Sequence, residues 1–479
     1  MVRPVVLLVN PNRMRPPIGP IGLDYVAEAL RRSGHEPALC DLGFAEDWPS
    51  ALDQAIAQTA PAAVGLSARN IDDAYFASQD FTLETTAAIA RRIMEDTPAP
   101  LILGGVGFSC APREVLRFLG APYGIVGDGE QALPQLLDCL GWGQDVSHVP
   151  GAVFRAAPGR IVVSPPQAVA LEALPAPSRR FADNRRYFAE GGQAGVETKR
   201  GCPHSCLYCV DPVAKGNATR LRSPRSVAEE FADLLDQGID AVHLCDSEFN
   251  LPPEHAHAVC EVLTRGGIGA RARWHTYASP RPFDRDLAKA MARAGCAGVN
   301  FGIDHTEAEM LRSLGRRHGP EDIRQAAQAC RDAGLAVMFD MLLGGPGETR
   351  QSIERAIGLM REIKPDRVGL SCGVRVYPHT PLARLVRSQG PIPSNPSLHG
   401  ATENNDDLLR PIFYVDSAIG PDIHRYVWSL VGDDKRFFAA NPDEADRNYN
   451  YNDNSVLSQA IAAGARGAYW DILRQLEEQ

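Results

Sequence analysis

The first 140 residues alternate between short apolar runs and longer amphipathic stretches. The apolar runs are rich in Val, Leu and Ile, as buried strands are, and the stretches between them have the period of helices. This alternation predicts a doubly wound α/β domain with a Rossmann-like parallel sheet. The expected strands are Val5–Val9, Pro37–Asp41, Ala62–Ser67, Leu101–Gly104 and Tyr123–Val126, and the expected helices include Gly22–Ser33 and Thr82–Asp96.

A second unit of the same kind follows a linker. Residues 146–190 are rich in Pro, Ala and Arg and have little periodicity, which favours a linker with room for a short hairpin. Alternation resumes over residues 191–387 and predicts a partial (βα)6 barrel with its site at the carboxyl ends of the strands. The expected strands are Val196–Lys199, Ala241–Cys245, Arg273–Tyr277, Gly298–Ile303, Ala336–Leu343 and Val368–Val376, and the expected helices include Ser226–Gln237, Asp284–Ala294 and Pro320–Ala333.

The remaining residues, 388–479, are expected to form a small C-terminal cap that selects the substrate. The segment opens with prolines and asparagines and ends in a stretch with helical period from Val456 to Leu476. Before that helix, the run Asn448-Tyr449-Asn450-Tyr451-Asn452 is both polar and aromatic. The run fits the lining of a substrate pocket and equally fits a solvated loop before a helix cap. Residues 1–145 are accordingly the first domain, and 191–387 the second.

Composition excludes several classes of protein. The 479-residue chain is 44% hydrophobic and 23% charged, which is typical of a multidomain globular protein. A net charge of −10 without long Lys/Arg clusters argues against a nucleic-acid partner. No apolar run reaches the roughly 18 residues that span a bilayer, and the N-terminus is not typical of a signal peptide. We therefore expect a cytoplasmic protein with no membrane partner.

Three of the eleven cysteines lie in one short loop. Cys202, Cys206 and Cys209 follow directly after the first expected barrel strand, in a CxxxCxxC pattern. Cysteines at this spacing supply three converging thiolates, which leaves one iron of a [4Fe–4S] cluster open. A zinc site would need a fourth Cys or His at short spacing, and His204 points the wrong way along the loop. A disulfide would leave one of the three cysteines unpaired.

The other cysteines are scattered through apolar strands and helices and are expected to be buried thiols. Cys245 and Cys372 lie near predicted strand ends. They could bind a soft substrate there, but packing is the favoured role.

The cysteine loop, the expected barrel and several later motifs together resemble the radical SAM (S-adenosylmethionine) superfamily. In that family the open iron chelates the amino and carboxylate groups of SAM, and an aromatic residue precedes the third cysteine, as Tyr208 does here. The resemblance implies that Cys202, Cys206 and Cys209 are the metal ligands and the catalytic centre. It also implies that Tyr208 belongs to the cofactor site.

Further motifs at the expected strand ends carry the same resemblance. Asp246-Ser247-Glu248-Phe249 resembles the segment that contacts the SAM amino group, which implies that Glu248 makes this contact. Gly302-Ile303-Asp304 resembles a Gly-x-Glu/Asp motif that contacts the ribose of SAM, which implies that Asp304 makes this contact. Gly344-Gly345-Pro346-Gly347-Glu348-Thr349 resembles a turn after the fifth strand and implies Gly344 and Gly345. A helix N-cap explains each acidic residue equally well when it is taken singly, but their shared place at strand ends favours the site.

Two glycine-rich turns mark the carboxyl edge of the first sheet, where doubly wound folds bind ligands. They are Gly104-Gly105-Val106-Gly107-Phe108-Ser109 and Gly127-Asp128-Gly129-Glu130, and each alone also fits a tight turn. Periodicity alone would equally allow a nucleotide-binding domain, although Gly-x-Gly-x-x-Gly is missing after the first strand. With the segment Ser67 to Asp72, the turns resemble the cobalamin-binding branch of the family. The resemblance implies cobalamin contacts from Arg69, Asn70, Gly104, Gly105, Gly107, Phe108, Gly127, Gly129 and Glu130.

The lower face of the cobalamin is expected to lack a histidine ligand. Many cobalamin proteins supply one through Asp-x-His-x-x-Gly, and no such run exists here, since His35 is followed by Glu36-Pro37-Ala38. In the tryptophan 2-methyltransferases, which this chain resembles, an arginine lies beneath the cobalt without coordinating it. Arg69 is the matching position, although taken alone it also fits a surface arginine.

The resemblance implies an enzyme of natural-product biosynthesis that moves a methyl group from SAM through cobalamin to an unactivated carbon. The favoured substrate is a small molecule with an aromatic heterocycle such as indole, and an electron donor such as flavodoxin or ferredoxin is expected. The alternative is a non-methylating radical SAM enzyme that transfers the 3-amino-3-carboxypropyl group, cyclises or rearranges, with a vestigial cobalamin domain. A sensor without turnover is less favoured, because SAM motifs are present and no DNA-binding helix pair is found.

Overall fold

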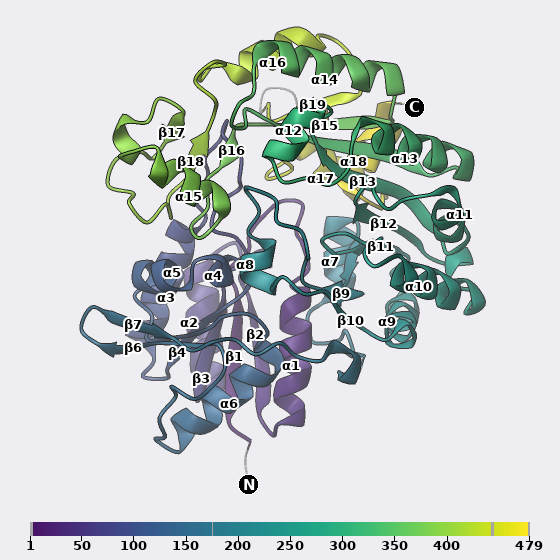
Figure 1. Ribbon diagram of the computed structural model, residues 1–479. Helices are drawn as coiled ribbons and strands as arrows, with labels where there is room; N and C mark the ends of the chain where they lie inside the picture. Colours follow the sequence, from purple (N-terminus) through teal and green to yellow (C-terminus); the bar gives the residue numbers. More distant parts are fainter. Residues whose placement is uncertain (1–2, 175, 442–444, 478–479) are drawn as a thin grey trace.

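The computed structural model describes residues 3–174, 176–441 and 445–477. Two α/β units face each other, and the C-terminal segment lies against the second of them (Figure 1). Among the described helices, none is long and apolar enough to cross a membrane.

The first sheet has the strand order β2-β1-β3-β4-β5-β6-β7. Its first five strands are parallel, and β6 and β7 are added antiparallel at one edge. The order reverses between β1 and β3, so a ligand crevice is expected at their carboxyl ends. The bounds are β1 (Val5–Asn10), β2 (Glu36–Asp41), β3 (Ala63–Ser67), β4 (Leu101–Gly104), β5 (Tyr123–Ile125), β6 (Ala152–Ala157) and β7 (Arg160–Val163).

Alternate residues of these strands supply two cores, as the period of a strand requires. Leu7 and Val9 pack on one face with α2, α3 and α5, whereas Val6 and Leu8 pack on the other with α1 and α6. The helices are α1 (Ile21–Arg32), α2 (Trp48–Thr59), α3 (Leu83–Asp96), α4 (Val106–Cys110), α5 (Pro112–Leu119) and α6 (Gly129–Gly141). The predicted strands and helices of this unit are thus present within one residue of their expected ends. The hairpin β6–β7 corrects the linker boundary, because it belongs to the sheet.

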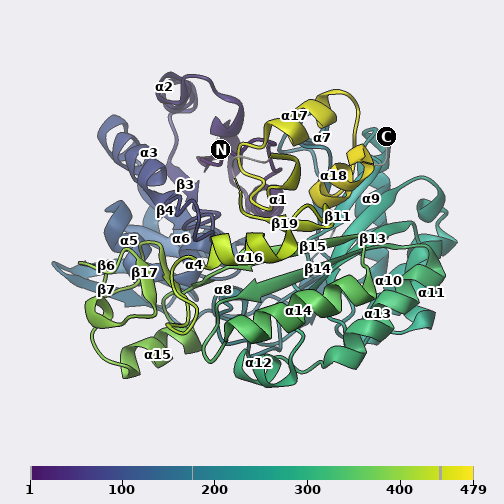
Figure 2. The same ribbon diagram turned by 90° about the horizontal axis from the view of Figure 1, so that it is seen from above.

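The second sheet is entirely parallel, with the order β19-β15-β14-β13-β12-β11-β8. It confirms the partial barrel and adds a seventh strand, β19, from the predicted cap. Its strands are β8 (Ala194–Val196), β11 (Ala241–Leu244), β12 (Arg273–Ala278), β13 (Cys296–Asp304), β14 (Ala336–Leu343), β15 (Arg367–Cys372) and β19 (Phe437–Ala439). Helices α10, α11, α13 and α14 cover its outer face (Figure 2). The helices of this unit are α7 (Asn184–Gly191), α8 (Asp211–Lys215), α9 (Pro224–Asp236), α10 (Pro253–Arg265), α11 (Arg285–Arg293), α12 (Ala308–Ser313), α13 (Pro320–Ala333) and α14 (Arg350–Ile363).

Two predicted barrel strands have the wrong bounds. The first ends at Val196, and the next residues form β9 (Lys199–Arg200), which pairs with β10 (Arg220–Leu221) in a separate antiparallel ribbon. The last ends at Cys372, because Gly373 has a φ of +84° and turns the chain out of the sheet. The chain then enters a small antiparallel sheet of β16 (Val374–Arg375), β17 (Leu398–Gly400) and β18 (Ile412–Tyr414), next to α15 (Pro381–Ser388).

The predicted C-terminal helix is in fact two helices. After α16 (Ile423–Val431), the chain forms α17 (Ser455–Ala462) and α18 (Tyr469–Glu477), and Gly464 and Gly467, with φ of +105° and +125°, lie between these two. Helices α17 and α18 lie on the opposite face of the second sheet from α14 (Figure 2). A Cβ on Gly298 of β13 would come within 2.9 Å of the Trp470 ring. Helix α18, which contains Trp470, therefore packs against the inner face of the barrel.

Candidate active site

The cysteine loop leaves β9 and returns to α8 at the mouth of the barrel. Cys202 and Cys206 are each 6% exposed, Cys209 is half-buried, and all three are free thiols. Gly201, with a φ of +92°, admits no side chain, because a Cβ would collide with the carbonyl of Ala218. Within the described residues no three Cys, His, Asp or Glu side chains approach closely enough to hold a single metal ion. A cubane cluster separates its cysteine sulfurs further than one ion does, so three thiols without a fourth ligand fit a [4Fe–4S] cluster.

Arg316 connects this loop to the predicted SAM residues. Its Nη1 donates to Cys206 Sγ at 3.3 Å, and its Nε lies 3.3 Å from Asp304 Oδ2. Its Nη2 lies 3.6 Å from Glu248 Oε1, and the side chain is 6% exposed. Arg316 is not among the residues that the sequence motifs predict. It belongs to an Arg-Arg pair after the fourth barrel strand, and nothing in its spacing from the cysteines reveals the contact.

The structure brings Tyr208, Glu248 and Asp304 together, as the motifs predict. The Tyr208 hydroxyl donates to Asp304 Oδ2 at 2.6 Å. Asp304 itself has a φ of +58° in a tight turn closed by a 2.6 Å hydrogen bond from His305 N to Ile303 O. Strained backbone of this kind clusters at functional sites.

Glu248 has a free carboxylate oxygen. Its Oε2 is buried and has no hydrogen-bond partner, and burial raises the pKa of Glu248 to about 7. An unpaired buried acceptor costs free energy until a donor arrives. The amino group of SAM is such a donor, so this carboxylate fits the predicted contact.

The buried side chain of Glu348 holds the glycine turn after β14 in place. Glu348 Oε2 accepts from the backbone N–H groups of Gly344 and Gly345, and Glu348 Oε1 lies 3.0 Å from His305 Nε2. The two backbone N–H groups are therefore not available to a ligand. A contact of Gly344 and Gly345 with SAM stays a prediction.

A cavity of about 290 Å³ lies at the carboxyl edge of the first sheet. Of the predicted cobalamin residues, Arg69, Gly104, Gly105, Gly127, Gly129 and Glu130 line it. Asn70, Gly107 and Phe108 do not line it. Phe108 is fully buried beneath Gly124, and Gly107 lies so close to the backbone of Asn70 that a Cβ on Gly107 would come within 2.8 Å of it. The backbone N–H groups of Gly107 and Phe108 donate to the carbonyls of Arg69 and Ala68, and these hydrogen bonds hold the loop after β3 in place.

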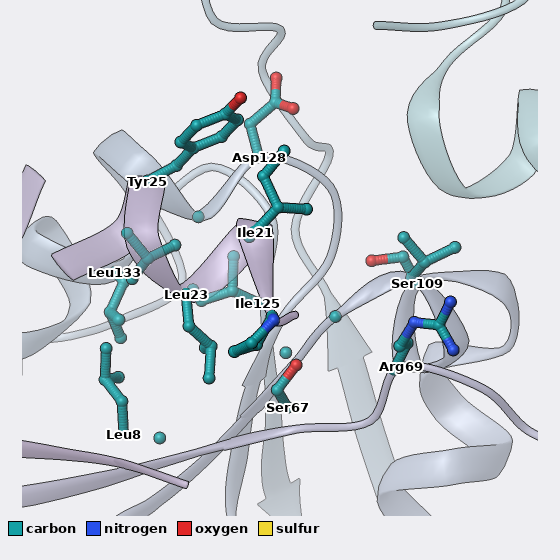
Figure 3. Close-up of a pocket in the computed structure, with 18 of the residues that line it drawn as sticks. Leu8, Ile21, Leu23, Tyr25, Ser67, Arg69, Ser109, Ile125, Asp128 and Leu133 are labelled. Atoms are coloured by element: carbon teal, nitrogen blue, oxygen red, sulfur yellow. The ribbon is translucent and has the colours of Figure 1, made fainter. Parts of the chain in front are cut away.

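The cavity has an apolar part and a polar part (Figure 3). Leu8, Leu23, Ile125 and Leu133 surround one end, whereas Ser67, Arg69 and Ser109 lie at the other. A large ligand with both apolar and polar surfaces, such as cobalamin, fits this lining.

The second unit closes the cavity. Ala214 and Lys215 of α8, which follows the cysteine loop, are part of its lining, as is Arg200. Arg200 lies two residues before Cys202 and forms ion pairs with Asp128 at 2.6 Å and with Glu130 at 2.9 Å. The predicted cobalamin turn and the cluster loop are therefore joined directly.

Arg69 lines the cavity and has no carboxylate partner among the residues that the structure describes. Its Nη1 lies 3.5 Å from Met14 Sδ. The side chain is exposed to solvent in the cavity that it lines, and desolvation by the surrounding protein lowers its pKa. No histidine is found among the described residues that line the cavity, and His35 lies apart from them, beside Ser33 and Asp138.

Comparison with known proteins identifies two families along the chain. Residues 13–137 match the B12 binding domain, and residues 196–360 match the radical SAM superfamily. The chain is 30% identical to the tryptophan 2-C-methyltransferase of Streptomyces laurentii, over 98% of this chain and 96% of that protein.

Two solved structures of the radical SAM methyltransferase TsrM from Kitasatospora setae share the whole fold. One, with tryptophan substrate and the SAM analogue aza-SAM bound, has a TM-score of 0.93 at 30% identity and covers 99% of this chain and 98% of that one. The other, with cobalamin and a [4Fe–4S] cluster bound, has a TM-score of 0.90 at 28% identity and covers 100% and 98%. The similarity extends over both sheets and the C-terminal segment. The chain belongs to the B12-binding radical SAM enzymes, as a cobalamin-dependent methyltransferase.

Proposed function

We propose that this enzyme transfers the methyl group of SAM, by way of cobalamin, to a ring carbon of a small molecule that carries an indole. The observation that carries the proposal is the direct link from Arg200 beside the cysteine loop to Asp128 and Glu130 on the cavity wall. Support for the indole comes from the Streptomyces laurentii relative, which is a tryptophan 2-C-methyltransferase, and from the tryptophan substrate in the Kitasatospora setae structure.

The chain's own residues have distinct roles in this proposal. Cys202, Cys206 and Cys209 hold the cluster, and Glu248 accepts hydrogen bonds from the SAM amino group. Arg316 holds Glu248 and Asp304 at the cluster loop through its contacts with both. When bound, the cluster chelates SAM and cobalamin carries the methyl group.

Arg69 and the cap complete the assignment. The resemblance assigns Arg69 to the lower face of the cobalamin, and there it would not act as a ligand, because a guanidinium stays protonated and has no lone pair to offer. Residues 388–479 select the substrate, and an electron donor such as flavodoxin or ferredoxin keeps the cluster reduced. These last two assignments are predictions from the resemblance.

The test follows two labels from SAM into the product. The protein is reconstituted anaerobically with iron, sulfide and cobalamin, and given tryptophan or simpler indoles with SAM labelled separately in its methyl and its aminocarboxypropyl carbons. Methyl label in the product supports the proposal. Aminocarboxypropyl label, or product formed without either label, would replace it with the non-methylating alternative.

A further inference from the structure

Three segments that are far apart in the sequence meet at the inner face of the second sheet. Tyr75 comes from the loop after β3, Asp340 from the middle of β14, and Tyr449 from the chain after β19. The Tyr75 hydroxyl donates to the Tyr449 carbonyl at 2.9 Å, and the two rings meet edge to face at 5.7 Å. The site around Asp340 is thus built from both units and from the C-terminal segment.

Asp340 is held there by its neighbours on the sheet. Asn300 of β13 donates to Asp340 Oδ2 at 2.8 Å. Gly369, which is paired with Asp340 across β14 and β15, admits no side chain. A Cβ at Gly369 would collide with Asp340 Oδ1 and come within 2.9 Å of the Tyr449 ring. The glycine therefore makes room for the carboxylate and the tyrosine side by side.

The carboxylate is not neutralised by the protein. No Lys, Arg or His of the described residues forms an ion pair with Asp340, and Oδ1 is buried without a regular hydrogen bond. Burial raises the pKa of Asp340 to about 6, while Tyr449 and Asn300 partly offset that rise. An ionised carboxylate of this kind is costly to bury unless a cation arrives to pair with it.

Tyrosines surround this carboxylate. Tyr277 of β12 pairs across the sheet with Asn300, the residue that donates to Asp340. Burial raises the pKa of Tyr75, Tyr277, Tyr449 and Tyr451, and the charge of Asp340 raises it further. The rings of Tyr449 and Tyr451 are 5.9 Å apart, and the Tyr451 hydroxyl is buried without a partner. Tyr277 is 43% exposed although it lies on a strand in the middle of the sheet, so a ligand has access to this group.

A carboxylate among aromatic faces is a receptor for a protonated amine, because the ring faces attract a cation and the carboxylate neutralises it. We propose that Asp340, with Tyr75, Tyr277, Tyr449 and Tyr451, binds a protonated amine of the methyl acceptor. The identity of this ligand as the methyl acceptor rests on the proposed function. The position agrees with that role, since Asp304 of the predicted SAM site pairs across β13 and β14 with Met341, the residue after Asp340.

The test compares two probes that differ only by the amine. Tryptamine and 3-ethylindole are measured by equilibrium dialysis against the reconstituted holoenzyme, and against the variants Asp340→Asn and Tyr277→Leu. Asp340→Asn keeps the shape of the side chain and an oxygen that accepts a hydrogen bond from Asn300, but it removes the negative charge. We expect it to weaken tryptamine binding about tenfold or more and to leave 3-ethylindole unchanged. Tyr277→Leu removes one ring face, so we expect a loss of a few fold for tryptamine alone.

Matched controls keep the result interpretable. Asp422→Asn removes an exposed carboxylate that pairs with Arg350 at 3.3 Å and should change neither affinity. The visible absorption of the cluster shows whether each variant has folded, and Tyr277→Leu tests the same group if Asp340→Asn has not. Equal losses for both probes, no loss for either, or a wild-type protein that does not prefer tryptamine would each overturn the proposal. Preferential binding without methyl transfer would leave the amine site intact and refute the proposed function instead.

Discussion

The Tyr208 hydroxyl donates a 2.6 Å hydrogen bond to Asp304 Oδ2, and so ties the cysteine loop to the end of β13. Arg316 lies on the same carboxylate at 3.3 Å and also donates to Cys206. The proposed cluster ligands and the predicted SAM-binding residues are therefore parts of one buried network. Replacing one of its members should therefore change cofactor binding more than it changes the stability of the fold.

Replacing Tyr208 with Phe should weaken SAM binding while the cluster remains. The ring keeps its packing, but Asp304 loses a hydrogen bond worth about 1 kcal/mol, which corresponds to about fivefold in affinity. Equilibrium dialysis of SAM with the reconstituted protein measures the effect. Tyr426→Phe, which removes an exposed hydrogen bond to Glu354, is the control. Loss of iron from Tyr208→Phe would contradict this division of roles.

Replacing Cys202, Cys206 and Cys209 together with Ala should abolish the visible absorption of the cluster, since only these thiols lie in the loop. Iron and sulfide analysis after anaerobic reconstitution checks the result. Cys372→Ala removes a buried thiol that packs in the core of the second unit and should retain the full cluster content. A cluster that persists in the triple variant would show that other residues hold it.

The parallel strands of both sheets are predictable because each is a buried apolar run between two helices. Strand β19 is not predictable, because it lies outside the alternation of strands and helices, and its place beside β15 depends on packing across the chain. The break between α17 and α18 is also missed, since amphipathic spacing continues through a segment whose glycines take positive φ. The alternation of apolar and amphipathic stretches therefore specifies the order of the elements, whereas the edge strand of the sheet and the ends of the helices depend on tertiary contacts.

The same distinction holds for the candidate site. The cysteines, Glu248 and Asp304 are found because each lies in a short motif. Arg316 and Asp340 have no such motif, and their partners come from other strands and loops. Cys245 is expected to be buried, but it is exposed, because its strand ends at Leu244 and leaves the side chain at the open mouth of the barrel.

Arg69 can be tested by spectroscopy of the bound cofactor. In the cob(II)alamin form, electron paramagnetic resonance of the wild type should lack nitrogen superhyperfine splitting from a lower ligand, because an arginine offers no lone pair. Arg69→His supplies an imidazole at the same place and should introduce that splitting, whereas Arg69→Lys should not. Splitting in the wild type would show that another residue ligates the cobalt.

Asp72 and Arg375 form a buried ion pair at 2.7 Å between the first unit and β16. Asp72→Asn should lower stability by about 3 kcal/mol, toward the lower end of the cost of breaking a buried pair, because backbone carbonyls such as that of Leu409 still accept from Arg375. Thermal unfolding of the wild type and variant measures the change. Glu229→Gln, in a pair whose side chains are 85% and 52% exposed, should change the midpoint little. Equal midpoints for Asp72→Asn and the wild type would contradict the prediction.

The pH dependence of amine binding should identify Asp340. The pKa of Asp340 is raised to about 6 in the ligand-free protein, so the carboxylate is charged above that pH and neutral below it. A bound ammonium favours the charged form, which means that its affinity is full above pH 6 and falls as the pH drops through that value. Tryptamine should therefore raise the Tm more at pH 7.5 than at pH 5, while 3-ethylindole raises it equally at both.

Other groups titrate in the same range, and the variant separates them from Asp340. Burial raises the pKa of Glu248 to about 7 and lowers the pKa of His243, beside Tyr277, to about 4. Both groups are retained in Asp340→Asn, so any pH dependence that they cause should survive in that variant. If the amine-specific rise in Tm keeps its dependence on pH in Asp340→Asn, the titrating group is one such as Glu248, because His243 is mostly neutral at both pH values, and the charge that binds the amine lies elsewhere.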